Sequence, residues 1–199
     1  MKTRILMAAT AALALAACGG DSENEDNLNT MPADNMMMPA DNITNAAGEA
    51  AMPQNGQEYA TMVGAGDMFE IESARLAQEK ATSDDIKELA EMIVTDHTTS
   101  TEQLRQAASQ AQPPVTVEPQ LNAEQQANMQ ALRSANGAQF DQAWLQQQLG
   151  AHQKALAMVQ HYAQNGDVPS LKQHAGTVAG PIQRHLERVQ ELQGGQGAE

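Results

Sequence analysis

The feature that most constrains the fold of this chain is a helical repeat of apolar residues through its C-terminal part. Between residues 57 and 193, apolar side chains recur every three or four positions in four long segments, and no stretch alternates with a period of two. Such a repeat places these side chains on one face of an α-helix. The last segment, about 168–193, shows it without a break, at Leu171, Ala175, Val178, Ile182, His185, Val189 and Leu192. We therefore expect long amphipathic helices and no sheet.

Residues that start or end helices separate the segments. Thr82 or Ser83 is suited to cap a helix that runs to about residue 111, and Pro113-Pro114 begins an extended connection. Asn122 can cap a short helix to about residue 135, and Asn-Gly pairs at 136–137 and 165–166 set the ends of a helix over about 138–164. The predicted fold is an all-α, up-down four-helix bundle over residues 57–193, with a short accessory helix between the second and third bundle helices.

The first segment, about 57–81, leaves an alternative open. Gly64 and Gly66 loosen its first half, while Phe69 and Leu76 mark its apolar side. Glycine weakens a helix interior by about 1 kcal/mol relative to alanine. If both glycines unravel this segment, a looser three-helix bundle results.

Composition excludes several classes of protein. The formal net charge is −14, which argues against nucleic-acid binding, because too few basic side chains are present to replace the counterions of a phosphate backbone. A single cysteine excludes a disulfide framework and cysteine-based zinc or iron–sulfur sites. Leu, Ile, Val and Phe number 31 of 199 residues, a proportion typical of disordered chains. We attribute that signal to the part of the chain that precedes the helical repeat.

Residues 1–17 have the organisation of a secretion signal. Lys2 and Arg4 precede an apolar run from Ile5 to Ala17 that is too short to span a bilayer as a mature helix. Leu15-Ala16-Ala17-Cys18 then resembles a bacterial lipobox, in which Cys18 is lipidated and becomes the first mature residue. The alternative is an ordinary signal peptide with a chance cysteine. Gly19 stands where aspartate tends to retain lipoproteins in the inner membrane, so we expect a lipid-anchored envelope protein at the outer membrane of a Gram-negative bacterium, facing the periplasm.

Residues 18–56 are predicted to form a disordered tether behind the lipidated cysteine. Residues 19–56 contain seven acidic side chains and no basic ones, they are rich in methionine, and they show no helical or strand period. Like charges repel and extend such a segment. We also expect the Gly-rich end, residues 194–199, to be disordered.

Three of the five histidines replace apolar residues on the predicted core faces of three different helices. In an up-down bundle, Ser83, Gln164 and Pro169 are expected at one shared end, and His97, His152 and His185 lie at similar separations from them along the chain. These separations differ by at most about four residues, which is about 6 Å along a helix axis. The three imidazoles are therefore predicted to meet inside the bundle.

Carboxylates on the first two segments are candidates to join them. Glu70 has small neighbours on its face of the helix and is the better inward carboxylate, with Glu72 second. Asp96, one residue before His97, is either an acceptor for a side chain of a neighbouring helix or a solvated acid. His174 lies three turns from His185 and is too distant to join the site, and His161 falls on the surface side.

Three imidazoles and one carboxylate can bind Zn²⁺, Fe²⁺, copper or Mn²⁺. We therefore consider a metal site of Glu70, His97, His152 and His185, with Glu72, Asp96 and Asp141 as supporting or alternative residues. The alternative is that the histidines are core residues satisfied by hydrogen bonds. The sequence has no Gly-rich phosphate loop, no context for a nucleophile and no His-Glu-x-x-His motif, so we do not expect an enzyme.

Several of these motifs resemble a known bacterial family. Glu70-Ile71-Glu72 with Arg75-Leu76-Ala77, the run Met92 to Thr98, Phe140-Asp141 with Ala151-His152-Gln153, and Pro181 through Leu186 are similar to motifs of the "domain of unknown function 4142" family of exported bacterial proteins. The resemblance covers about residues 57–192. It implies a ferritin-like bundle and draws attention to Glu70, Glu72, Asp96, His97, Asp141, His152 and His185. The paired Glu-x-x-His motifs of di-iron proteins are missing from this sequence.

Two functions remain after this reading of the sequence. The first is a lipid-anchored envelope protein whose bundle binds a transition metal, for metal buffering or protection against stress. The second is a non-catalytic interaction or structural module of the envelope, with the histidines as polar core.

Overall fold

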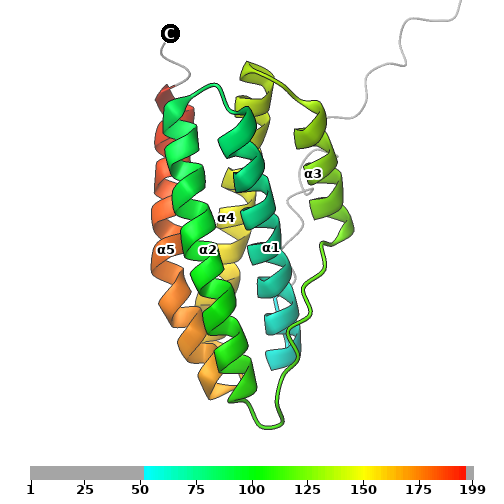
Figure 1. The fold of residues 1–199 in the computed structure, drawn as a ribbon. Helices are drawn as coiled ribbons and strands as arrows, with labels where there is room; N and C mark the ends of the chain where they lie inside the picture. The colour runs from blue at the N-terminus through cyan, green and yellow to red at the C-terminus, as the bar shows by residue number, and fades with distance from the viewer. Residues whose placement is uncertain (1–51, 196–199) are drawn as a thin grey trace, which may run out of the picture. The chain divides into compact units, whose positions relative to one another are not determined.

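The computed structural model describes residues 52–195 (Figure 1). Within this range the chain forms five helices and no strand: α1 (Gly56–Lys80), α2 (Asp84–Ser109), α3 (Ala123–Ser134), α4 (Ala138–Asn165) and α5 (Pro169–Gly195). The predicted all-α class, with four long helices and a short accessory helix, is confirmed. The expected signal peptide, Cys18 and most of the expected tether lie outside the described residues, as do residues 196–199. Helix α5 includes Gly194 and Gly195, which the sequence assigns to a disordered tail.

The glycines of α1 do not interrupt it, so the three-helix alternative is wrong. The helix is continuous from Gly56 to Lys80. A Cβ atom at position 64 would lie 3.4 Å from the Pro119 side chain and 3.6 Å from that of Val117, in the connection between α2 and α3. The missing side chain at Gly64 therefore lets this connection pass close to α1.

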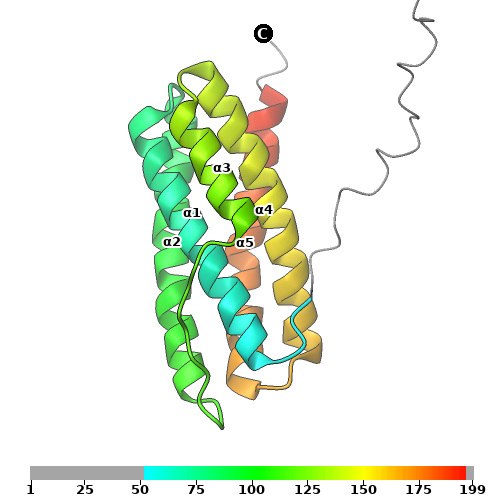
Figure 2. The same cartoon turned by 90° about the vertical axis from the view of Figure 1, so that its right-hand side faces the viewer.

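The long connection after α2 determines the directions of the bundle helices. Figures 1 and 2 show it running back along α1 to α3, so that α4 begins at the same end of the bundle as α2. Thr82, just before α2, bonds to Asp141 in the first turn of α4, which fixes the same arrangement. Helices α2 and α4 are thus parallel to each other, and each packs against the antiparallel helices α1 and α5. The expectation that Gln164 and Ser83 share one end is wrong.

The histidines still lie at similar depth because each is near the middle of its helix. From the end where α2 begins, His97 is as far along the chain from Ser83 as His152 is from Ala138. A residue at the middle of a helix keeps its depth when the helix direction is reversed. The prediction of a common depth therefore survives the wrong assumption about direction.

The apolar core consists of two clusters on either side of the middle of the bundle. The upper cluster, at the end where α2 begins, includes Phe69, Ile86, Ile93, Phe140, Trp144 and Val189. The lower cluster, at the opposite end, includes Tyr59, Leu104, Val159, Tyr162, Leu171 and Ile182. Along each long helix, buried polar residues lie between the residues of the upper cluster and those of the lower cluster: Asp67, Glu70, Ser73, His97, Ser100, Gln148, His152 and His185. We call this set the polar layer.

The buried face of α4 is wider than the predicted one. The apolar repeat predicts a core face of six residues, of which three are fully buried and three only half-buried: Leu145, His152 and Val159 in the first group, and Leu149, Leu156 and Ala163 in the second. Gln148, Met158 and Tyr162, which lie outside this repeat, are also fully or almost fully buried. Helix α3 covers part of the flank between α1 and α4, so the buried surface of α4 is wider than a single apolar stripe predicts.

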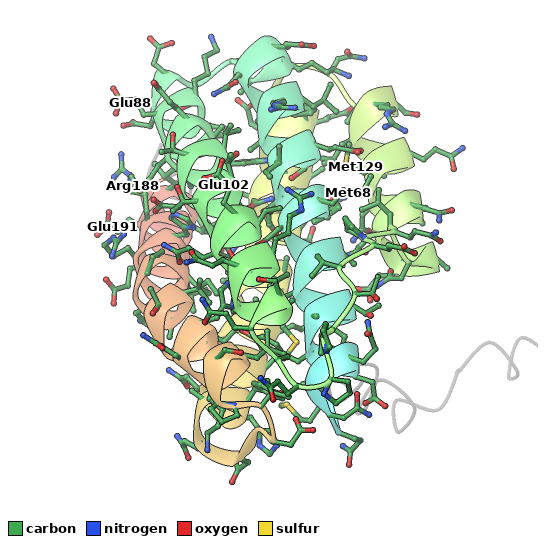
Figure 3. All side chains as sticks on the ribbon, turned by 60° about the horizontal axis from the view of Figure 1, so that its bottom comes forward. Met68, Glu88, Glu102, Met129, Arg188 and Glu191 are labelled. Atoms are coloured by element: carbon green, nitrogen blue, oxygen red, sulfur yellow. The ribbon has the colours of Figure 1, made fainter. Side chains whose placement is uncertain are left out.

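Charged side chains cover the outer surfaces of α2 and α5. Figure 3 shows Glu88, Glu102, Arg188 and Glu191 pointing away from the bundle. Arg188 links the two helices through an ion pair of 2.8 Å with Asp85. Exposed pairs of this kind contribute little to stability, so the two clusters supply most of it.

Asp141 fastens the loop between α1 and α2 to α4. Its buried carboxylate accepts hydrogen bonds from the backbone N–H groups of Thr82, at 3.1 Å, and Ser83, at 3.3 Å, and from the Thr82 hydroxyl. The sequence suggests Asp141 as an alternative site residue. The structure places it at the loop, on the far side of the upper cluster from the polar layer.

We predict that Asp141→Ala lowers the free energy of unfolding by about 2–3 kcal/mol, because it removes the charged acceptor of several part-buried hydrogen bonds from Thr82 and Ser83. Urea denaturation followed by circular dichroism measures the change. Glu72→Ala is the matched control, since Glu72 is half-exposed and its only ion pair within the described residues is a 3.9 Å contact with Arg133. Equal effects of the two substitutions would contradict the assignment of Asp141 to the loop.

Candidate metal site

Three histidine rings meet in the polar layer. His97 comes from α2, His152 from α4 and His185 from α5, and all three are buried. Their ring centroids lie 5.2–5.7 Å apart. One ring nitrogen from each residue lies within 4.8 Å of the other two. The prediction that these three imidazoles converge is met in the structure.

Each of the three rings is held by an acceptor at its other nitrogen. His97 Nδ1 lies 2.8 Å from Asp67 Oδ1. His152 Nδ1 lies 3.0 Å from the backbone carbonyl of Gln148, and His185 Nε2 lies 3.0 Å from Asp96 Oδ2. Carboxylate and carbonyl oxygens accept hydrogen bonds, so each of these nitrogens is the one that carries the proton. The acceptors thus fix the tautomer and orientation of all three rings.

The remaining nitrogens point toward one another. They are His97 Nε2, His152 Nε2 and His185 Nδ1, and the last two are 3.2 Å apart. His97 Nε2 is buried and has no hydrogen-bond partner in the described part of the chain. Two lone pairs this close repel each other unless a proton or another cation lies between them or beside them. The site is therefore built to hold positive charge.

The three histidines differ in proton affinity. Burial disfavours the charged form of His97, but the hydrogen bond to Asp67 and the negative charges of Asp67, Glu70 and Asp96 outweigh it, so the pKa of His97 is raised. Burial and the charge of His97 lower the pKa of His185 to about 4, although Asp96 acts in the opposite direction. Burial, with His97 and His185 as neighbours, also lowers the pKa of His152. Of the three rings, His97 is therefore the one that holds a proton most readily.

Glu70 lies behind the three rings. It is buried, as predicted for an inward carboxylate, and its Oε1 is 4.0 Å from His152 Nδ1, the nitrogen that bonds to Gln148. It does not belong to the group of three converging nitrogens. Its Oε2 has no hydrogen-bond partner among residues 52–195. Burial raises the pKa of Glu70 to about 7, against an opposing effect of His97. The structure thus places Glu70 next to the imidazole group, on the side of α1.

The other predicted residues lie in different places. Asp96 is half-buried and binds His185, as an acceptor toward a neighbouring helix should, and it also lies 3.5 Å from Arg184. Glu72 pairs with Arg133 outside the polar layer. His161 is exposed. His174 is buried beside the lower cluster, where it bonds to the Tyr59 hydroxyl at 2.8 Å and to the Ser100 carbonyl at 3.2 Å.

Asp67 is the main residue of the site that our sequence analysis missed. It is buried, and besides His97 it accepts hydrogen bonds from the hydroxyl groups of Ser100, at 2.8 Å, and Thr101, at 3.2 Å. Its spacing offered a signal, because Asp67 and Glu70 are three residues apart and share one face of a helix. The role of Gln148 was not predicted either, because His152 bonds to its backbone carbonyl and every residue has such a group.

This arrangement can bind one transition-metal ion. In metal-binding histidines, the ring nitrogen that does not bind the metal commonly donates its N–H to a carboxylate or a backbone carbonyl. All three rings have such an acceptor here. Three imidazole nitrogens suit zinc, copper or iron, and the acceptors around them hold the rings without taking part in binding.

Comparison with known proteins identifies a family and a fold. The sequence model of the family described as "Domain of unknown function (DUF4142)" matches residues 42–192. Among solved structures, CopM in the Cu(I)-bound form is 18% identical with a TM-score of 0.59, over 70% of this chain and 96% of that chain. CopM in the Ag-bound form is also 18% identical, with a TM-score of 0.58 over the same shares of both chains. CopM in the Cu(II)-bound form is 19% identical with a TM-score of 0.60, over 71% of this chain and 97% of that chain. No curated protein matched the sequence.

We predict that Glu70→Gln stabilises the protein more at alkaline than at acidic pH. The pKa of Glu70 is about 7 in the fold and 4.5 in its absence, so the unfolded chain loses a proton that the folded chain keeps. Stability is therefore lost as pH rises through this window, whereas glutamine does not titrate. From about pH 4.5 to about pH 8, the free energy of unfolding of the variant should rise by about 3 kcal/mol relative to the unmodified chain.

Urea denaturation at both pH values, with a chelator present, measures this difference. Glu72→Gln, the same substitution at a half-exposed position of the same helix, is the matched control. The same relative stability of Glu70→Gln at both values would show that burial does not perturb Glu70.

Proposed function

The chain belongs to the DUF4142 family, and we propose that in this member the bundle binds one copper ion through His97, His152 and His185. The observation that carries the proposal is the convergence of three nitrogens whose rings are each fixed by a separate acceptor. A polar core needs hydrogen bonds, but it does not need three lone pairs directed at one point. A bound cation would remove the repulsion between the lone pairs of His152 and His185, whose nitrogens are 3.2 Å apart.

Copper is the metal to test first. The converging atoms are all imidazole nitrogens, and no thiolate is available among residues 52–195, because the only cysteine is Cys18. Imidazole suits copper, zinc and iron, and affinities for first-row divalent ions peak at copper. CopM, whose fold is similar, has been solved in Cu(I)-, Cu(II)- and Ag-bound forms. At 18–19% identity this similarity gives an analogy of fold, and the histidines of this chain carry the argument.

Glu70 and Asp96 support the ion without binding it in this proposal. Asp96 orients His185, and Asp67 orients His97. The Glu70 carboxylate, next to His152, supplies negative charge on the α1 side and lies outside the three-nitrogen group that would hold the ion. Zinc, iron and manganese remain competitors at the same site.

The cell envelope is the place we propose for this activity. Within residues 52–195 no helix is both long and apolar enough to cross a membrane. Attachment is assigned instead to Cys18, after a signal peptide of residues 1–17, because Leu15-Ala16-Ala17-Cys18 fits a lipobox. A copper site held beside the outer membrane would serve to buffer the metal or to protect the envelope from it.

The metal assignment predicts about one copper ion per chain that depends on the three histidines. We expect His152→Gln to weaken copper binding about 100-fold or more, since loss of a supporting residue alone typically costs 10–100-fold. The full chain, produced without a polyhistidine tag and freed of metal by a chelator, is titrated with copper, and bound metal is measured by mass spectrometry. Copper that binds outside the three-histidine site is measured with the His152→Gln variant and subtracted.

His174→Gln is the matched control for this experiment. His174 is also buried and has two hydrogen-bond partners, yet it lies beside the lower cluster and away from the converging nitrogens. Its substitution should leave copper binding unchanged. If neither copper, zinc nor iron binds, and none raises the melting temperature, the histidines are a polar core and the bundle is an interaction or structural module.

The envelope assignment predicts that the mature chain carries acyl chains on Cys18. Mass spectrometry of the protein extracted from a Gram-negative host should show loss of residues 1–17 and a lipid-sized increase in mass. Cys18→Ser should remove the lipid and release the protein from the membrane fraction. Membrane association of Cys18→Ser equal to that of the unmodified chain would contradict the anchor.

A further inference from the structure

Beyond the three nitrogens, we propose that the cavity between α2 and α5 is the position of a fourth, exchangeable ligand of the metal, such as water or a small anion. This inference rests on the proposed metal site. It adds that the ion is open to small molecules on one side.

The cavity has a volume of about 80 Å³ and reaches two of the three histidines. Its wall includes His97 and His185, together with Asp96. His152 does not line it, so the cavity approaches the group of nitrogens from one side only. A space of this size has room for several water molecules, since a single one needs about 10–15 Å³ by the same measure.

The rim of the cavity lies at the protein surface. Thr99 of α2 and Thr177 of α5 are both exposed and both line the cavity. On the opposite side of the nitrogens, α1 and α4 close the site with Glu70, Ser73 and Gln148, all buried. Small molecules can therefore reach the ion from the α2–α5 side.

An unpartnered nitrogen on a residue of the cavity wall indicates that the cavity holds a ligand. His97 is more than nine-tenths buried, its Nε2 has no partner in the described residues, and it forms part of the wall. Pro181, also in the wall, has no N–H, so the Thr177 carbonyl lacks the donor that it would have in a regular helix. The unpartnered His97 nitrogen thus belongs to a residue of the cavity wall, and an apolar filling of the cavity would leave it without a hydrogen bond.

The coordination number supports the same conclusion. Three protein ligands and one open position are typical of metal sites that exchange a water or a substrate, whereas closed structural sites use four protein ligands. Glu70 is the nearest additional carboxylate, and it lies outside the three-nitrogen group. The fourth position is therefore left to a ligand from solvent.

The volume of the cavity limits the ligand to small molecules. Asp96 lines both this cavity and an adjoining hollow on α2 that also includes Glu88 and Glu91. This acidic surface attracts cations and disfavours anions of any size, so water is the expected resident ligand. A small monoanion such as azide fits the volume and would be drawn in by the positive charge of the bound metal.

Azide binding to the copper(II)-loaded full chain tests the inference. Azide that binds copper(II) produces a charge-transfer absorption band, which we expect to saturate on titration. Thr99→Phe and Thr177→Phe fill the rim and should weaken azide binding about tenfold or more, because the added rings occupy space through which azide reaches the ion. Both positions are exposed, so the bundle tolerates the change.

Thr98→Phe is the matched control. Thr98 and Thr99 are adjacent, exposed, and each donates its hydroxyl to the carbonyl four residues earlier, but only Thr99 lines the cavity. Thr98→Phe should bind azide as the unmodified chain does, and copper content should be the same in all variants. The absorbance from azide that binds copper outside the three-histidine site is measured in the His152→Gln variant and subtracted.

The outcomes separate the two proposals. If copper binds and azide produces no band, or if all three phenylalanine variants bind azide equally, the exchangeable ligand is overturned and the copper site stands. If copper does not bind, the proposed function fails, and this inference fails with it.

Discussion

The burial of three imidazole rings between two apolar clusters is the constraint on which the rest of this structure depends. A buried polar group without a partner costs free energy, so each ring needs an acceptor, and each acceptor needs a place on its own or a neighbouring helix. Asp67 on α1 serves His97 on α2, and Asp96 on α2 serves His185 on α5. These bonds tie α1, α2 and α5 together at one level and determine which faces of the helices turn inward.

The same bonds prepare the site for chemistry. With one nitrogen of each ring committed to an acceptor, the other three are directed to a common point, and the pKa values of His152 and His185 are lowered so that their lone pairs stay available at neutral pH. Glu70 is held in the fold with a raised pKa, which is a cost to stability that an apolar residue would avoid. Retaining such groups in the core is typical of functional sites. The cavity beside His97 and His185 extends this view, because it leaves one side of the point open to solvent.

The sequence predicted correctly those properties that depend on one helix alone. The unbroken repeats containing His97 and His185 identified these residues as inward-facing, and Ser83 and Asn122 were correctly expected to cap their helices. It failed where two elements meet. Gly64 was expected to loosen the first half of α1, although it makes room for the connection after α2. Asp141 was considered as a supporting or alternative site residue, although it holds the loop before α2. The role of Asp67 depends on its closeness in space to His97, a residue on another helix.

The sequence by itself thus determined the class of the fold, the number and extent of the helices within residues 52–195 and most of the side chains that face the core, because these follow from the period of the α-helix and from local capping. Only the tertiary structure decided the directions of the helices, the acceptor of each histidine and the separation of Glu70 from the three nitrogens. The helix directions depend on how the connection after α2 returns along α1, and the contacts among residues of different helices follow from the packing that results, which no local pattern in the sequence encodes.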